Sequence, residues 1–227
     1  MRPDDPNLPT LTLIAEALGT LCDELVFVGG CAAGLLLTDV QATGIRPTDD
    51  VDAVAEAATL SRFYAIEAEL PKRGFVRDAE SGVICRWKHR DSRITFDLMP
   101  TDPQVLGFAN RWYPEAVRTA STERLAERLN IRLISAPVFV ATKLEAFITR
   151  GKRDLYSHDL EDILIVVDGR PALPQELRQV SAELRLFVAA ELTTLLRQPD
   201  FENVLPGLIA DGQRTDIVLA RLREMTA

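Results

Sequence analysis

The most constraining stretch of this sequence is an apolar run that ends directly at a pair of glycines. Residues 25–28, Leu-Val-Phe-Val, are apolar and partly β-branched, and Gly29 and Gly30 follow at once. Such a run is typical of a buried strand, and glycines allow the tight turn that must follow it. The small apolar residues 31–38 suit a helix packed closely on that strand. At such a junction, backbone N–H groups at a helix start are placed to bind phosphate.

A second stretch puts two carboxylates on one face of a predicted strand. In residues 50–54, Asp-Val-Asp-Ala-Val, side chains alternate between the faces, so Asp50 and Asp52 point the same way. Two close carboxylates repel each other unless a cation lies between them, and paired carboxylates suit Mg²⁺. Asp97, in the alternating segment 93–99, would add a third carboxylate to such a metal cluster. The alternative interpretation is a solvated strand edge.

The pattern of apolar residues changes character near residue 136. Before it, we predict strands at 25–28, 50–54, 83–89, 93–99 and 131–134, helices at 10–21 and 59–70, an irregular segment at 100–114 and a helical turn at 123–128. After it, we predict helices at 138–150, 158–167, 174–197 and 215–225. The expected fold class is therefore α+β, a small mixed β-sheet flanked by helices and followed by a helical C-terminal region. The expected domains are residues 1–135 and 136–227.

Composition and charge exclude several classes of protein. Of the 227 residues, 47% are apolar and 26% are charged, an ordinary globular balance that argues against disorder. The net charge of −8 excludes an overall basic coat for nucleic acid but leaves room for a local basic patch. Three cysteines and two histidines without CxxC or HExxH spacing argue against structural zinc. The first residues, MRPDDPNLPT, hold acids and prolines where a signal peptide has its apolar core, and no membrane-length apolar run exists. We expect a cytoplasmic protein with no membrane partner.

Taken in order, these motifs resemble those of a known superfamily. The sequence Val28-Gly29-Gly30, then Asp50-Val51-Asp52, then Phe96-Asp97-Leu98, is similar to the motifs of polymerase-β-type nucleotidyltransferases. More narrowly, Arg46-x-Thr48-x-Asp50-x-Asp52 resembles the AbiEii/MenT nucleotidyltransferase toxins, in which a helical lysine and an aspartate motif follow. Lys143, Asp159 and Asp162 match that lysine and that motif in order. The resemblance covers about residues 25 to 168, and the rest of the chain matches only as helical.

The resemblance implies an Mg²⁺-dependent enzyme that moves a nucleoside monophosphate from an NTP to a hydroxyl and releases pyrophosphate. Mn²⁺ is the alternative ion. The implied metal ligands and catalytic acids are Asp50, Asp52 and Asp97, with Asp97 also helping to deprotonate the acceptor. The implied nucleotide-binding residues are Gly29, Gly30, Arg46, Thr48 and Lys143. Asp159 would orient Lys143 or contact the base or ribose.

The residues outside the three acids also have plain structural interpretations. Lys143 lies among apolar residues and suits a lysine that reaches water from a helix edge. Asp159 and Asp162 follow the predicted helix cap Ser157, where acids complement the helix dipole. Arg46 would hold phosphate or pair with acids close to it.

The acceptor is suggested by a concentration of basic residues in an acidic chain. On a predicted strand, alternation puts Arg86, Lys88 and Arg90 on one face, where they could guide an RNA backbone. A charged edge strand that prevents aggregation is the alternative. The resemblance makes tRNA or another RNA the leading acceptor and a toxin–antitoxin pair, with a cognate antitoxin, plausible. A small-molecule or protein acceptor and a non-catalytic nucleotide-binding module are the other hypotheses. Nothing in the sequence predicts the preferred NTP or the oligomeric state.

Overall fold

The chain folds into two compact units, and each is described by itself. The structure is a computed structural model that describes residues 4–42, 44–57 and 59–227, so the first three residues of the N-terminal segment considered above lie outside it. Among the described positions, unit 1 holds residues 4–32 and 47–135, and unit 2 holds residues 33–46 and 136–227. Within these ranges, none of the helices combines the length and apolar character that crossing a bilayer requires.

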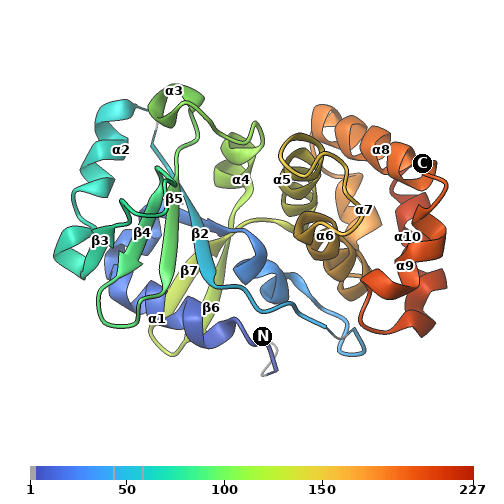
Figure 1. Cartoon of the computed structure of the whole chain (residues 1–227), viewed down its shortest axis with the longest axis horizontal. Helices are drawn as coiled ribbons and strands as arrows, with labels where there is room; N and C mark the ends of the chain where they lie inside the picture. Colours follow the sequence, from blue (N-terminus) through green and yellow to red (C-terminus); the bar gives the residue numbers. More distant parts are fainter. Residues whose placement is uncertain (1–3, 43, 58) are drawn as a thin grey trace. The chain divides into compact units, whose positions relative to one another are not determined.

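Unit 1 is built on one mixed sheet, whose strands are drawn as arrows in Figure 1. Its described strands are β1 (Leu25–Val28), β2 (Asp50–Ala55), β3 (Phe75–Arg77), β4 (Arg86–His89), β5 (Thr95–Met99), β6 (Ser121–Ala126) and β7 (Leu129–Leu133). They lie in the order β3-β4-β5-β2-β1-β7-β6. The pairs β2–β5 and β1–β7 are parallel, and the other neighbouring pairs are antiparallel.

The middle of this sheet is its apolar core. All four residues of β1 are buried, as its continuous apolar run predicts for a strand covered on both faces. In β2, Val51 and Ala53 are buried while Asp50 and Asp52 are half-buried, the alternation that the sequence predicts. The sheet therefore holds the two acids on one side of a strand whose other side anchors it in the core.

Helices and short 3-10 turns complete unit 1. They are α1 (Leu8–Leu18), η1 (Gly19–Glu24), α2 (Leu60–Glu67), η3 (Pro71–Arg73), α3 (Pro103–Leu106) and α4 (Tyr113–Thr119), while η2 (Gly30–Leu36) runs on into unit 2. Helix α1 contacts β2 and β7, and α4 contacts β1. The hydroxyl of Thr59 accepts a hydrogen bond from the Arg62 N–H and so caps α2.

Unit 2 is helical in its described part. Its helices are α5 (Ala136–Thr149), α6 (His158–Gly169), α7 (Leu173–Leu177), α8 (Ala182–Leu196), α9 (Phe201–Leu208), η4 (Gly212–Arg214) and α10 (Thr215–Glu224). Helix α5 contacts α6, α7 and α8, and α10 contacts the same three helices. The first nine residues of α5 are all buried, so α5 is a central helix covered on every side. Ser157 caps α6 as predicted, accepting from the Leu160 N–H.

The mixed sheet with flanking helices confirms the predicted α+β class, with four local corrections. The helical turn expected at 123–128 is wrong, because this segment is β6, paired with β7. The single helix expected at 174–197 is two helices, since Ser181 starts α8 by accepting a hydrogen bond from the Leu184 N–H. The segment 100–114 contains α3 and the start of α4 rather than irregular chain, and the helix expected at 31–38 is the 3-10 turn η2.

Candidate active site

Three carboxylates of unit 1 gather on two neighbouring strands. Strands β2 and β5 run parallel, and their register sets Asp52 directly beside Asp97, with Asp50 two residues earlier on β2. One carboxylate oxygen from each of Asp50, Asp52 and Asp97 lies within 4.8 Å of the others. Asp97 is only 6% exposed, and the two acids of β2 are half-buried. Three oxygen ligands this close fit a hard divalent cation such as Mg²⁺, so the cluster is able to hold a metal.

Gly29 and Asp52 depend on each other sterically. The register of β1 with β2 pairs Val28 with Asp52, and Gly29 follows with φ +71°. A Cβ atom at Gly29 would lie 1.9 Å from the Oδ2 atom of Asp52. No side chain fits between the turn and the carboxylate. Gly29, the residue after β1, therefore lets the backbone lie directly beside the carboxylate of Asp52.

Arg86 is the basic residue that contacts this cluster. It lies on β4 opposite Asp97 of β5. Its Nε donates to Oδ1 of Asp97 at 2.9 Å and its Nη2 to Oδ2 at 2.7 Å, and Nη2 is 3.5 Å from Oδ2 of Asp50. The hydrogen bonds to Asp97 raise the pKa of the Arg86 guanidinium above its usual value, so it is a permanent cation. Lys88, on the same face of β4, pairs with Asp78 at 2.9 Å. Two of the three residues of the expected basic strip are therefore held by acids.

Thr48 lies two residues before β2, and so just ahead of Asp50 in the chain. Its hydroxyl donates to the backbone carbonyl of Asp50 at 3.3 Å, and its N–H donates to the side-chain oxygen of Asn7 at 2.9 Å. Gly30, the second glycine of the turn that follows β1, is the first residue of η2. Thus Thr48 and Gly30 belong to the same unit as the three acids.

In unit 2, Lys143 of α5 lies between two carboxylates of α6. Its Nζ is 3.2 Å from Oδ1 of Asp159 and 2.6 Å from Oδ2 of Asp162. Lys143 is 8% exposed, Asp159 6% and Asp162 1%, so this ammonium does not reach water from a helix edge. A dipole effect alone does not account for Asp162 either, because a fully buried carboxylate needs the partners it has here. The arrangement fixes the position of one positive charge within unit 2.

Two arginines extend this ion-pair network. Arg150 donates to both carboxylate oxygens of Asp159, at 3.0 and 2.9 Å. Arg46 has its Nη2 3.4 Å from Asp162 and its Nε 3.8 Å from Glu161. Burial alone would raise the pKa of Asp159, but the hydrogen bonds from Arg150 and the charge of Lys143 outweigh it and hold that pKa below its ordinary value. Asp159 is therefore an anion at neutral pH.

The sequence-predicted residues thus fall into two groups, one in each unit. Unit 1 brings together the three acids, Gly29, Gly30 and Thr48, and unit 2 brings together Lys143, Asp159 and Arg46. The roles of Arg86 and Arg150 in these clusters were not predicted, and Asp162 was predicted only to match the downstream aspartate motif and to complement the helix dipole. A periodic signal existed for Asp162, which is three residues from Asp159 on α6, whereas Arg150 directly follows the end of α5 at Thr149.

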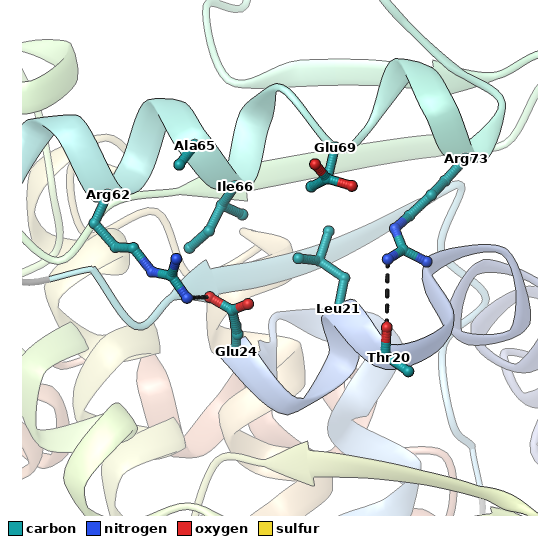
Figure 2. A pocket seen from close by; sticks show the side chains of 8 residues that line it. All are labelled: Thr20, Leu21, Glu24, Arg62, Ala65, Ile66, Glu69 and Arg73. Atoms are coloured by element: carbon teal, nitrogen blue, oxygen red, sulfur yellow. Dashed lines mark hydrogen bonds and ion pairs between the residues drawn. The ribbon is translucent and has the colours of Figure 1, made fainter.

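A cavity of about 320 Å³ lies elsewhere in unit 1, between η1 and α2 (Figure 2). Glu24, which lines it, directly precedes β1, so the cavity is at the opposite end of β1 from Gly29. Figure 2 shows Arg62 joined to Glu24, and Arg73 donating to the Thr20 hydroxyl at 3.4 Å. The cavity is therefore separate from the three acids.

Buried cysteines offer no nucleophile at either cluster. Cys22, Cys31 and Cys85 are all buried, and desolvation raises the pKa of each thiol to about 12. A thiol with that pKa carries almost no thiolate at neutral pH. The chemistry available at the three acids is therefore that of carboxylates, the Arg86 guanidinium and backbone N–H groups.

Comparison with known proteins identifies the fold. The chain matches no protein-family model, and no curated protein matches it. Among solved structures it is similar to an antigenic nucleotidyltransferase-like protein from Paracoccidioides brasiliensis, with a TM-score of 0.50 and 19% identity. That similarity covers 89% of this chain and 93% of the other. The fold is therefore nucleotidyltransferase-like.

Proposed function

We propose that this protein is an Mg²⁺-dependent nucleotidyltransferase that transfers a nucleoside monophosphate from an NTP to a hydroxyl of RNA. One observation carries the proposal: three carboxylates lie within 4.8 Å of one another on adjacent strands, beside a glycine turn. A nucleotidyltransferase needs a place for a divalent ion and for phosphate at the same point. The three carboxylates support the first, and the glycine turn beside them is our proposal for the second. The nucleotidyltransferase-like fold supports the same reading.

In the proposed reaction, Asp50 and Asp52 hold the metal. When bound, Mg²⁺ offsets the negative charge that develops on the phosphate oxygens. The backbone N–H groups of Gly29 and Gly30 hold the β- and γ-phosphates, which is possible because Gly29 presents no side chain. Asp97 accepts the proton of the acceptor hydroxyl as its oxygen attacks the α-phosphorus. The bond from that phosphorus to the β-phosphate breaks, and pyrophosphate leaves.

The residues of unit 2 are assigned to the triphosphate and the nucleoside. Lys143 supplies a positive point charge for the triphosphate, and its position is set by Asp159 and Asp162 at 3.2 and 2.6 Å. Asp159 thereby orients Lys143. Arg46 is assigned to phosphate, and Asp162 holds it at 3.4 Å. In unit 1, Thr48 keeps the start of β2 in place through its bond to Asp50.

RNA is the proposed acceptor, with tRNA first among the candidates and a toxin of a toxin–antitoxin pair as the biological setting. The residues that support an RNA backbone contact are the exposed cations between β4 and β5, namely Arg90 and Arg93. Lys72 is exposed as well, but it pairs with Glu69 at 2.6 Å. Such contacts weaken as salt rises, so transfer to RNA should fall with ionic strength.

The test is to incubate the pure protein with each α-³²P-labelled NTP, Mg²⁺ and total cellular RNA. We expect label to enter RNA with the wild-type protein and not with Asp50→Asn, which keeps the size of the side chain and removes its charge. Glu115→Gln, an acid of the same unit whose side chain is 17% exposed and pairs with the exposed Arg118, is the matched control and should label RNA normally. Mg²⁺-dependent NTP binding without labelled RNA would contradict the RNA acceptor and favour a small molecule or a protein. Absence of NTP binding would contradict the enzyme assignment.

A further inference from the structure

Arg86 uses both oxygens of one acid in the cluster. Its guanidinium makes two hydrogen bonds to Asp97, at 2.9 and 2.7 Å, in the parallel fork geometry that is the strong form of such a pair. The pair is largely shielded from water, because the side chain of Arg86 is 26% exposed and that of Asp97 is 9% exposed. Charge pairs of this kind are screened little by salt.

The strand register and two buried neighbouring residues fix the position of Arg86. Its backbone is paired with that of Asp97 in the β4–β5 register, so the two side chains start from neighbouring points on one face. The residues before and after it, Cys85 and Trp87, are buried at 4% and 5% exposure and anchor the strand. The Arg86 guanidinium is therefore a built part of the cluster rather than a mobile surface charge.

We propose that Arg86 takes the place of one metal ion, so that the cluster binds a single divalent cation between Asp50 and Asp52. The four side chains Asp50, Asp52, Asp97 and Arg86 carry formal charges of −1, −1, −1 and +1, hence −2 together, which one divalent ion neutralises. A second ion near Asp97 would have to displace a bidentate guanidinium and would meet its repulsion. The sequence-based expectation that Asp97 is a metal ligand is changed accordingly: Asp97 is the partner of Arg86.

This inference rests on the proposed function and specifies how its site is charged. Asp97 remains able to accept the acceptor's proton, because a carboxylate offers about four lone-pair positions and Arg86 uses two. Arg86 is thus a positioning residue: it orients the Asp97 carboxylate and limits the site to one ion.

The test counts bound Mn²⁺ per full-length chain by electron paramagnetic resonance of the free ion. We expect one Mn²⁺ for the wild type and two for Arg86→Met, which keeps an unbranched apolar stem and removes the charged guanidinium. The first Mn²⁺ should also bind about tenfold more tightly in Arg86→Met. Lys88→Met is the matched control, because Lys88 lies on the same face of β4 but pairs with Asp78, and it should bind one Mn²⁺.

Two Mn²⁺ in the wild type, one in both proteins, or none in the wild type would each overturn the proposal. The first two outcomes leave the proposed function standing, since that function is decided by labelled RNA in the transfer assay. No Mn²⁺ in the wild type would contradict the metal site of the proposed function as well. A second measurement covers the case in which Arg86→Met does not fold. The side-chain Nε–H signal of wild-type Arg86, assigned with Arg86→Lys, should keep its position and its slow exchange when Mg²⁺ saturates the protein. Loss of that signal on adding Mg²⁺ would mean that the ion displaces the guanidinium, which also overturns the proposal.

Discussion

At the scale of the residue, Gly29 is the position where the turn and the acid cluster constrain each other most tightly. Gly29→Ala would put a Cβ 1.9 Å from Oδ2 of Asp52, at a φ of +71° that side chains rarely adopt. We expect the free energy of unfolding to fall by about 2–4 kcal/mol, from strain and overpacking together, and Mn²⁺ to bind more weakly because Asp52 must move. Urea unfolding and a Mn²⁺ titration measure the two effects.

Gly82→Ala separates backbone strain from steric overlap. Gly82 has the same φ of +71°, but a Cβ there meets nothing within 4 Å. It should lose only the part of the stability that comes from backbone strain, about 1 kcal/mol, and should bind Mn²⁺ as the wild type does. Equal loss of stability in both variants, with unchanged Mn²⁺ binding, would show that Gly29 does not position Asp52.

Single residues also show what the sequence allowed us to predict. Alternation within a strand is a local property, so the sequence predicts that Asp50 and Asp52 share one face of their strand. For the same reason it predicts that Asp97 lies on the face of its strand opposite Phe96 and Leu98. The pairing of Arg86 with Asp97 depends on which strands are neighbours and in what register, and a single sequence does not contain that information. For this reason Arg86 was interpreted as part of an exposed basic strip.

At the scale of the element, helices α5 and α6 are joined by a buried charge cluster whose strength should depend on pH. The pKa of Asp159 is lower in the folded protein than its ordinary value near 3.9, because Arg150 and Lys143 outweigh burial. The unfolded chain therefore binds the proton more readily, and the stabilisation is complete above about pH 4 and is lost as the pH falls through the folded pKa. Asp159→Asn should cost about 3 kcal/mol near pH 7, and this difference should shrink below pH 4.

Urea unfolding between pH 3 and pH 7, followed by helical circular dichroism, tests this dependence. Glu224→Gln is the matched control, because Glu224 pairs with Arg178 at 3.1 Å in the same unit but both side chains are about half exposed. Exposed pairs contribute little, so this variant should unfold like the wild type at every pH. A constant difference between Asp159→Asn and the wild type down to pH 3 would contradict the lowered pKa.

The wrong prediction for residues 123–128 has its physical cause in the place of β6 within the sheet. Strand β6, Ser-Thr-Glu-Arg-Leu-Ala, has one buried residue, Leu125, because it is the outer strand of the sheet and pairs only with β7. Without an apolar face its sequence shows no period of two, and helix-forming residues suggested a turn. In contrast, β1 and β2 lie at the centre of the sheet, and their burial leaves a clear pattern.

At the scale of the whole molecule, the roles proposed for residues of unit 1 and of unit 2 can be tested separately. We expect an NTP analogue that resists hydrolysis, with Mg²⁺, to slow amide hydrogen exchange in β1, η2 and β2 and also in α5 and α6. A ligand that binds only the folded state suppresses local opening, and at 100 times its Kd the slowing approaches about 100-fold. Helix α10 carries none of the assigned residues and should exchange as before. Protection confined to unit 1 would contradict the roles given to Lys143 and Asp159 while leaving Asp50 and Asp52 as the metal site. Protection that persists in Asp50→Asn would contradict the metal site itself.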